Sequence, residues 1–343
     1  MSLSCTPSRL RLVVLAAVVT LATSGPVFAQ APDAPAPARL ELRPGDRIVL
    51  VGNTLADRQQ YFNHFETTLL ALYPQLELSM RNLGWSADTL TLQPRPLNFG
   101  QTPQHLATYK ADVILAFFGA NDSFEGKAGI PQFEKDLEAY IETHRAAKYN
   151  GTGAPRLAVV SPIAHERLAR LVHVDVDARN RELARYTEAM RRVTSRLGVP
   201  FADVFTPMQD AMVSAGAPLT VNGMHLNDEG DKAFAVALLT ALGLAPEALP
   251  AGSKGYADLR ALINEKNRLF FLRFRPLNAE YVVGRRVEPF GSVNFPPEMK
   301  RLDELIAAQE KKIWKQARAV TPKPVTPPRP RGSAVSLDEQ GAR

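Results

Sequence analysis

The turn at residues 52–54 carries the first group able to do chemistry. Gly52-Asn53-Thr54 follows a hydrophobic run, Ile48-Val49-Leu50-Val51, and precedes a segment with helical spacing. A glycine-led turn between a strand and a helix is where many α/β hydrolytic enzymes place a nucleophile. Here the hydroxyl belongs to a threonine, and an amide precedes it in place of a carboxylate. Thr54 is therefore a candidate nucleophile, and the alternative is that it caps the helix beginning near Leu55.

Two further blocks carry an amide and an imidazole. Asn121 comes two residues after Gly119, just beyond a buried strand, and His225 comes three residues after Asn222, just before a helix. An imidazole can take the proton of an attacking hydroxyl and later protonate the leaving alcohol. Each block alone has an ordinary explanation, because Asn121-Asp122 and Asn222-Gly223 are also common turn pairs. Their joint occurrence is what indicates a site.

The elements that must position these groups alternate along the chain. Short apolar runs predict strands, and segments with helical spacing lie between them. The predicted strands are Arg47–Asn53, Leu76–Asn82, Asp112–Phe118, Arg156–Ser161 and Pro200–Val204. The predicted helices are Asp57–Leu72, Ile130–Lys148, Asp177–Leu197 and Asn227–Leu242. This alternation predicts an α/β fold, a three-layer α/β/α sandwich around a parallel sheet, with function at the carboxyl ends of the strands.

These blocks resemble the SGNH (GDSL-type) hydrolases. That family has Gly-Asp-Ser after the first strand, a glycine after the second, Gly-x-Asn-Asp after the third and Asp-x-x-His before the last helix. The order and spacing agree across residues 46–243. The segment NEKNRLFFLRFRPLNAEYVVGRR also resembles the extension of a bacterial branch in which Gly-Asn-Ser or Gly-Asn-Thr replaces Gly-Asp-Ser.

The resemblance implies a role for each matching position. Thr54, His225 and Asn222 would be the catalytic residues, and the oxyanion hole would be the backbone N–H groups of Thr54 and Gly84 with the Asn121 amide. One such donor contributes about 3–4 kcal/mol in the transition state. Glycine at 84 would let the backbone approach the substrate. We also expect Asn53 and Trp85 to contact substrate; the alternative for Trp85 is the core.

The departure at position 222 matters most for rate. An aspartate orients the histidine and stabilises the imidazolium, and its change to asparagine costs a serine protease roughly 10⁴ in kcat. The Asn222 carbonyl oxygen could accept the Nδ1–H of His225. Another carboxylate, such as Asp228, is an alternative orienting group. Threonine in place of serine also adds a methyl group that must fit the turn.

The flanking segments define the organisation of the chain. Residues 1–29 have a basic start, an apolar run and Val27-Phe28-Ala29, which predict a secretory signal cut after Ala29; an uncleaved anchor is the alternative. Residues 30–45 read as an Ala/Pro-rich linker and 46–250 as the hydrolase-like domain. Residues 251–320 are predicted to form a helical extension packed on it. Residues 321–343 are Pro-rich and predicted to be disordered.

Composition excludes several classes of function. The one cysteine, Cys5, lies in the predicted signal, so the mature chain cannot form a disulfide, use a thiolate or bind zinc through cysteine. The other histidines lack a ligand-like spacing, and we expect neither metal nor cofactor. Removal of the signal lowers the formal net charge of the 343-residue chain from +6 to +4, which is no nucleic-acid signature. No later stretch is long and apolar enough to span a membrane.

Together these features predict an exported ester hydrolase, periplasmic or extracellular, acting on acyl groups such as acetyl esters of carbohydrates. The alternative is a catalytically impaired SGNH module that binds an acylated glycan or a protein partner. A third is a structural envelope protein tethered by its basic C-terminus. Between Lys311 and Arg331 the charged residues are all basic, which suggests weak contact with anionic envelope polymers; a solvated, disordered tail is the alternative.

Overall fold

The structure is a computed structural model that describes residues 39–170, 172–244, 254–275 and 282–320. The predicted signal at 1–29, the first part of the linker and the tail at 321–343 lie outside these residues. Within the described part, no helix is both long and apolar enough to cross a membrane. The described residues belong to one compact unit.

The centre of the fold is a parallel five-stranded sheet in the order β2-β1-β3-β4-β5. The strands are β1 (Arg47–Gly52), β2 (Ser79–Asn82), β3 (Val113–Phe117), β4 (Arg156–Val160) and β5 (Phe201–Ala202). In register, Leu50 of β1 faces Leu115 of β3, which in turn faces Ala158 of β4. The predicted parallel sheet is confirmed.

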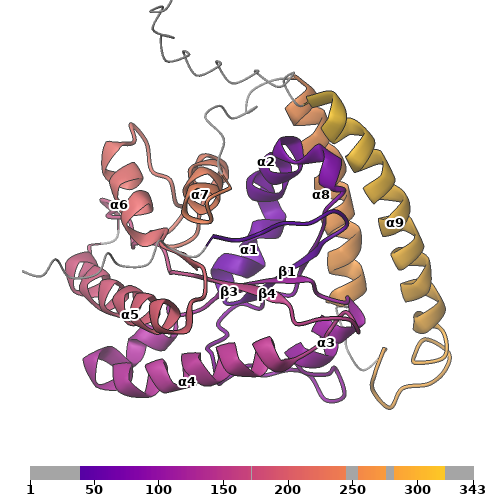
Figure 1. Ribbon diagram of the computed structural model, residues 1–343, viewed down its shortest axis with the longest axis horizontal. Helices are drawn as coiled ribbons and strands as arrows, with labels where there is room; N and C mark the ends of the chain where they lie inside the picture. The colour runs from indigo at the N-terminus through magenta and orange to yellow at the C-terminus, as the bar shows by residue number, and fades with distance from the viewer. Residues whose placement is uncertain (1–38, 171, 245–253, 276–281, 321–343) are drawn as a thin grey trace, which may run out of the picture. The chain divides into compact units, whose positions relative to one another are not determined.

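Helices cover both faces of this sheet (Figure 1). They are α1 (Thr54–Phe62), α2 (His64–Leu72), α3 (Thr102–Thr108), α4 (Gly126–Ala146), α5 (Val176–Leu197), α6 (Phe205–Ser214) and α7 (Asp228–Ala241). Alternate residues of β1 point to opposite faces. Ile48 and Leu50 pack with residues of α2 and α7, whereas Val49 and Val51 pack with residues of α3, α4 and α5. The predicted three-layer sandwich is confirmed.

Two predicted elements differ in detail. The single helix predicted over Asp57–Leu72 is two helices, because Asn63 adopts a left-handed conformation with φ 60° between α1 and α2. The predicted second strand begins only at Ser79, since Pro74–Leu76 forms a 3₁₀ turn. Helices α3 and α6 were not predicted, and both are short.

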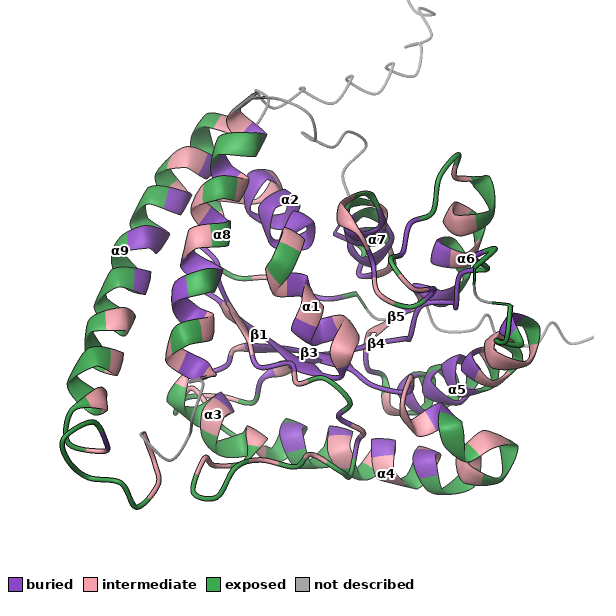
Figure 2. Ribbon diagram, turned by 180° about the vertical axis from the view of Figure 1, so that it is seen from behind, coloured by how far each residue is buried: buried purple, intermediate pink, exposed green. Residues whose placement is uncertain are grey.

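The extension consists of two long helices, α8 (Lys254–Phe274) and α9 (Phe295–Val320), that pack against each other beside the edge strand β2 (Figures 1 and 2). Its apolar residues join both cores: Leu259 and Ile263 pack in one, Leu269 and Phe270 in the other. The extension therefore covers the open edge of the sheet.

A buried polar cluster fastens α8 to the sandwich, and we call it the α8 junction: Glu66, Arg81, Lys266, Asn267 and Glu310. The Lys266 ammonium is fully buried and donates to Glu66 Oε1 at 2.6 Å and to the Met80 carbonyl at 3.0 Å. Asn267 donates to the other oxygen of Glu66 at 2.8 Å, and Arg81 donates to Glu310 at 2.7 Å. Every charge in the junction has an opposite charge beside it.

Candidate active site

The turn after β1 presents Thr54 at the carboxyl edge of the sheet. Gly52 has φ 123°, and a Cβ there would lie 2.0 Å from the Phe117 carbonyl oxygen of β3, so only glycine fits. Asn53 is the N-cap of α1, because its Oδ1 accepts the N–H of Leu55 at 3.0 Å. Thr54 is therefore the first helical residue, and the capping role belongs to Asn53.

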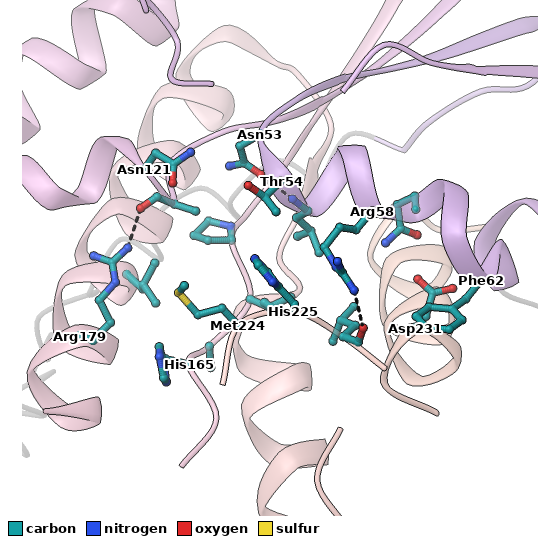
Figure 3. A pocket seen from close by; sticks show the side chains of 18 residues that line it. Asn53, Thr54, Arg58, Phe62, Asn121, His165, Arg179, Met224, His225 and Asp231 are labelled. Atoms are coloured by element: carbon teal, nitrogen blue, oxygen red, sulfur yellow. Dashed lines mark hydrogen bonds between the residues drawn. The ribbon is translucent and has the colours of Figure 1, made fainter. Parts of the chain in front are cut away.

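Thr54, Asn121 and His225 line one pocket at this edge, and Figure 3 shows their side chains around the same space. The pocket has an empty volume of about 700 Å³ including its open mouth. Its other lining residues are Asn53, Leu55, Arg58, Gln59, Phe62, Ala120, Pro162, Ile163, Ala164, His165, Arg179, Leu183, Met224, Leu226 and Asp231. The structure thus brings the predicted hydroxyl, amide and imidazole together in a mostly apolar cavity.

The Thr54 hydroxyl has a backbone donor that the sequence analysis missed. Ala87 donates its N–H to Thr54 Oγ1 at 3.2 Å, and Ala87 has φ 69°, a left-handed conformation uncommon for alanine. The N–H of Thr54 itself has no acceptor within the described residues, as expected at the first turn of a helix. The Ala87 N–H therefore holds the Thr54 hydroxyl, and the Thr54 N–H remains available to a ligand.

Gly84 does not have the predicted geometry. Its N–H donates to Asn82 Oδ1 at 2.8 Å, and Gly84 is not among the residues lining the pocket. A Cβ at Gly84 would lie 2.4 Å from the Asp57 nitrogen. Glycine is required because the loop packs on α1, and the donor beside Thr54 is supplied by Ala87 three residues later.

The Asn121 amide is fixed by the loop after β2. Its Nδ2 donates to the Asp88 carbonyl at 3.1 Å, which leaves its second hydrogen for the pocket. Asp88 is held in turn by two bonds from Arg95, at 2.9 and 2.6 Å. The neighbouring Asp122 holds the turn, because its carboxylate accepts the N–H groups of Leu90 and Gly119.

Asn222 holds His225 in the opposite way from an aspartate. Its Oδ1 accepts the backbone N–H groups of Met224 at 3.2 Å and His225 at 2.9 Å. The amide nitrogen is thereby turned toward His225 Nδ1, at 3.2 Å. An amide nitrogen can only donate, so Nδ1 must accept and the proton of the neutral ring resides on Nε2. The expectation that the Asn222 carbonyl accepts Nδ1–H is therefore wrong.

The electrostatics keep the imidazole neutral. Burial and the nearby Arg58 guanidinium both lower the pKa of His225. Asp228, the alternative orienting carboxylate, binds elsewhere: its Oδ1 lies 3.0 Å from His64 Nε2 and 2.6 Å from Arg260 Nη1. The structure gives it no contact with His225.

Trp85 lies outside the pocket lining. The guanidinium groups of Arg95 and Arg275 lie over its ring, at 4.5 and 3.9 Å from the ring centre. Arg275, just after α8, also donates to Asp57 at 2.7 Å and to the Gly84 carbonyl at 3.2 Å. Trp85 thus joins the loop beside Thr54 to the extension, as the alternative core interpretation expected.

Five polar residues of the pocket escaped the sequence analysis: His165 and Arg179, and three on helices α1 and α7. Arg58 and Gln59 face it from α1, and Asp231 faces it from α7. Burial raises the pKa of Asp231 to about 7. These residues belong to helical faces with no motif, and only the four-residue spacing of Thr54 and Arg58 hinted that both share one face. No group of three histidine, cysteine or acidic side chains suited to a metal occurs among the residues described.

Comparisons with known proteins agree with this fold. The family model of the GDSL-like lipase/acylhydrolase family matches residues 45–233, more than half of the chain. No curated protein sequence matches. Among solved structures, a gut microbial diltiazem-metabolizing enzyme has a TM-score of 0.57 at 13% identity, covering 82% of this chain and 97% of that one. That likeness shows the fold.

Two further structures align less closely. A GDSL-like lipase from Parabacteroides merdae has a TM-score of 0.48 at 16% identity, covering 60% of this chain and 100% of its own. An acetylxylan esterase from Geobacillus stearothermophilus has a TM-score of 0.45 at 14% identity, covering 61% and 100%. On the family match, with the predicted blocks arranged in the expected fold, this chain belongs to the GDSL-like lipase/acylhydrolase family.

Proposed function

We propose that this protein is an exported hydrolase that cleaves small acyl esters, such as acetyl esters of carbohydrates. The observation that carries the proposal is the convergence of the Thr54 hydroxyl, the Asn121 amide and the His225 imidazole on one pocket, with the Ala87 N–H donating to the Thr54 hydroxyl. A hydroxyl, a base and preorganised donors at one point are what acyl transfer requires.

The reaction follows from these positions. Thr54 Oγ1 attacks the ester carbonyl carbon while His225 takes the hydroxyl proton. The Thr54 N–H and the Asn121 amide stabilise the oxyanion. Collapse of this intermediate releases the alcohol, which receives the proton from His225, and leaves an acyl-threonine. Water, deprotonated by His225, then attacks the acyl group and releases the acid and the free Thr54 hydroxyl.

Asn222 supports a second candidate function. With the proton of the neutral ring on Nε2, the nitrogen that could act as base is Nδ1, which the Asn222 amide already occupies. Turnover then requires the imidazole to exchange its proton or its orientation first. A module that binds an acylated glycan without cleaving it has the same pocket and needs no such change.

Release of p-nitrophenol from p-nitrophenyl acetate distinguishes the hydrolase from the binding module. A hydrolase loses this activity in Thr54→Ala and in His225→Ala, and keeps or increases it in Thr54→Ser, which retains the hydroxyl and removes a methyl group. Full activity in Thr54→Ala contradicts the proposed nucleophile. No activity in wild type, together with binding of an acetylated xylo-oligosaccharide measured by calorimetry, favours the binding module.

Export is part of the proposal and rests on residues 1–29. Expression of the full chain in a bacterial host with separation of the periplasm tests it. We expect the mature chain there to begin at Gln30, as read by N-terminal sequencing. A full-length chain retained in the cytoplasm contradicts export and leaves the esterase proposal intact.

A further inference from the structure

Arg58 stands one helical turn from the nucleophile, on the same face of α1. Thr54, Arg58 and Phe62 all line the pocket, and their four-residue spacing stacks them along the helix. One turn advances about 5.4 Å along the axis. The guanidinium therefore lies within reach of a substituent a few bonds away from an ester carbonyl held at Thr54, and Figure 3 shows it beside His225.

This guanidinium lacks a partner that balances its charge. Its Nε is buried and has no hydrogen-bond acceptor, its Nη2 makes one long contact, 3.5 Å, to the Leu226 carbonyl, and its Cζ lies 5.1 Å from the centre of the Tyr61 ring. No described carboxylate forms an ion pair with it. By contrast, Arg47 pairs with Asp112 at 2.7 Å and Arg156 donates to Asp46 at 2.9 Å. A buried donor without an acceptor is costly in a folded protein, and a ligand that accepts its hydrogen bond removes that cost.

The other charged groups of the pocket do not fill this role. Asp231 is the one carboxyl in the described pocket wall, and its Oδ2 already accepts the His64 N–H at 3.1 Å. Arg179, on the α5 side, donates to the Ala120 carbonyl at 2.6 Å and lies 3.9 Å over the Phe124 ring. Arg179 also has a buried Nε without an acceptor, but its short bond to Ala120 fixes it, whereas the 3.5 Å contact of Arg58 leaves that guanidinium available to a ligand.

We infer that the substrate is an ester bearing a carboxylate a few bonds from the scissile carbonyl, and that Arg58 binds this carboxylate. The inference rests on the proposed function and names its substrate class. A guanidinium presents a planar fork of donors that matches a carboxylate, so the interaction gives orientation as well as charge. Gln59 adjoins this position, and its buried Oε1 lacks a donor, which a hydroxyl on the same substrate would supply.

Binding to a protein that cannot turn over tests this apart from catalysis. In a Thr54→Ala chain, calorimetry compares the affinities for monomethyl succinate and for methyl butyrate. Monomethyl succinate carries a carboxylate in its acyl part, and methyl butyrate is its neutral counterpart. A second pair is 4-acetoxybenzoate and methyl 4-acetoxybenzoate. The first carries a carboxylate in its alcohol part, and the second is its neutral counterpart. We expect the anionic member of at least one pair to bind about tenfold tighter or more, a preference typical of a charge-assisted bond.

Arg58→Gln should abolish that preference, and Arg58→Lys should retain part of it because the charge remains without the fork. The matched control is Arg301→Gln, which removes the same charge at an exposed position where Arg301 pairs with Glu304 of its own helix. The inference is overturned if neither anionic ester is preferred, or if Arg58→Gln keeps the full preference. If the wild type prefers the anionic ester but does not hydrolyse esters, the hydrolase proposal is refuted and the carboxylate site stands. If the wild type hydrolyses esters but shows no anion preference, the carboxylate site is refuted and the hydrolase proposal stands.

Discussion

The pocket and the α8 junction differ in whether their buried polar groups have partners, although only one helix separates them. In the α8 junction, the fully buried Lys266 and Glu66 satisfy each other, and Asn267 completes the second carboxylate oxygen. In the pocket, Arg58 Nε and Gln59 Oε1 are buried without partners. α1 begins at Thr54 in the pocket and ends beside Asn63, whose amide donates to Asn264 of α8 at 2.8 Å.

This difference indicates that the polar groups of the α8 junction stabilise the fold, whereas the unpaired groups of the pocket are available to bind a ligand. Paired buried charges fix the position of α8 and leave nothing for a ligand to add. Unpaired donors and acceptors destabilise the free protein and are the groups that a substrate can satisfy. Substitutions should therefore affect turnover and binding in the pocket, and unfolding in the α8 junction.

The largest effect is expected from Asn222→Asp. A carboxylate in the same orientation would still accept the Met224 and His225 N–H groups with one oxygen, and its second oxygen would accept Nδ1–H of His225. The unprotonated nitrogen then becomes Nε2, so kcat should rise by up to about 10³–10⁴. Steady-state hydrolysis of p-nitrophenyl acetate measures the change. The control, Asn227→Asp, adds the same charge in the same loop, and an equal gain there would show that the effect is not specific to His225.

Breaking the α8 junction should cost stability. Lys266→Met keeps the length of the side chain and leaves Glu66 buried without its counter-charge, which should lower the free energy of unfolding by about 3–5 kcal/mol. Urea denaturation monitored by circular dichroism measures this, with the exposed Lys311→Met as control. A second substitution, Glu66→Gln, should recover part of the loss by removing the unpaired charge. A Lys266→Met protein as stable as wild type would contradict the assigned role of the junction.

Asp231 should make stability depend on pH. Its pKa is about 7 in the folded protein against an ordinary 3.8. Below pH 3.8 the carboxyl is neutral in both states. As pH rises toward 7 the unfolded chain loses this proton first, so the free energy of unfolding falls through that window. Asp231→Asn should remove this loss and stabilise the protein at pH 8 by about 1–3 kcal/mol. Melting curves at pH 5 and pH 8 test it; a difference between the two proteins that does not vary with pH would exclude titration of Asp231.

The smallest effect is expected from deleting residues 321–343. The Pro-rich composition of this segment predicts no packed structure, so the melting temperature and esterase activity should not change. Retention on an anionic matrix at low ionic strength should decrease, because Lys323, Arg329 and Arg331 are removed. A lower melting temperature would mean that this segment packs on the folded part.

The fold was predictable because its signals are local. Apolar runs for the strands and helical spacing between them suffice to predict a parallel sheet, and strand ends of such a sheet meet at one edge. The break at Asn63 was not predictable, since its left-handed conformation is supported by contacts with Asn264 and Asn267, some 200 residues away in the chain.

The site was predictable only as far as side-chain identity decides it. Thr54, Asn121 and His225 lie where their motifs predict. Whether Gly84 or Ala87 aims its N–H at Thr54 depends on the path of a loop, and the direction of the Asn222 amide depends on two backbone donors. Neither the path of the loop nor the direction of the amide can be inferred from residue types alone.

The sequence Asn222-Gly223 also has a consequence for the chemical ageing of the protein. Asparagine followed by glycine is prone to deamidation, in which the glycine nitrogen attacks the side-chain amide, ammonia leaves, and water opens the resulting ring, partly to aspartate. In the folded protein the Gly223 N–H donates to Thr220 Oγ1 at 2.9 Å, which restrains that nitrogen. Heating, which loosens the loop, and alkaline storage, which favours deprotonation of the glycine nitrogen, are expected to produce a fraction of chains with the carboxylate at 222. Intact-mass analysis of each preparation should therefore accompany every rate, because a small converted fraction carrying the more active site could dominate the measured turnover.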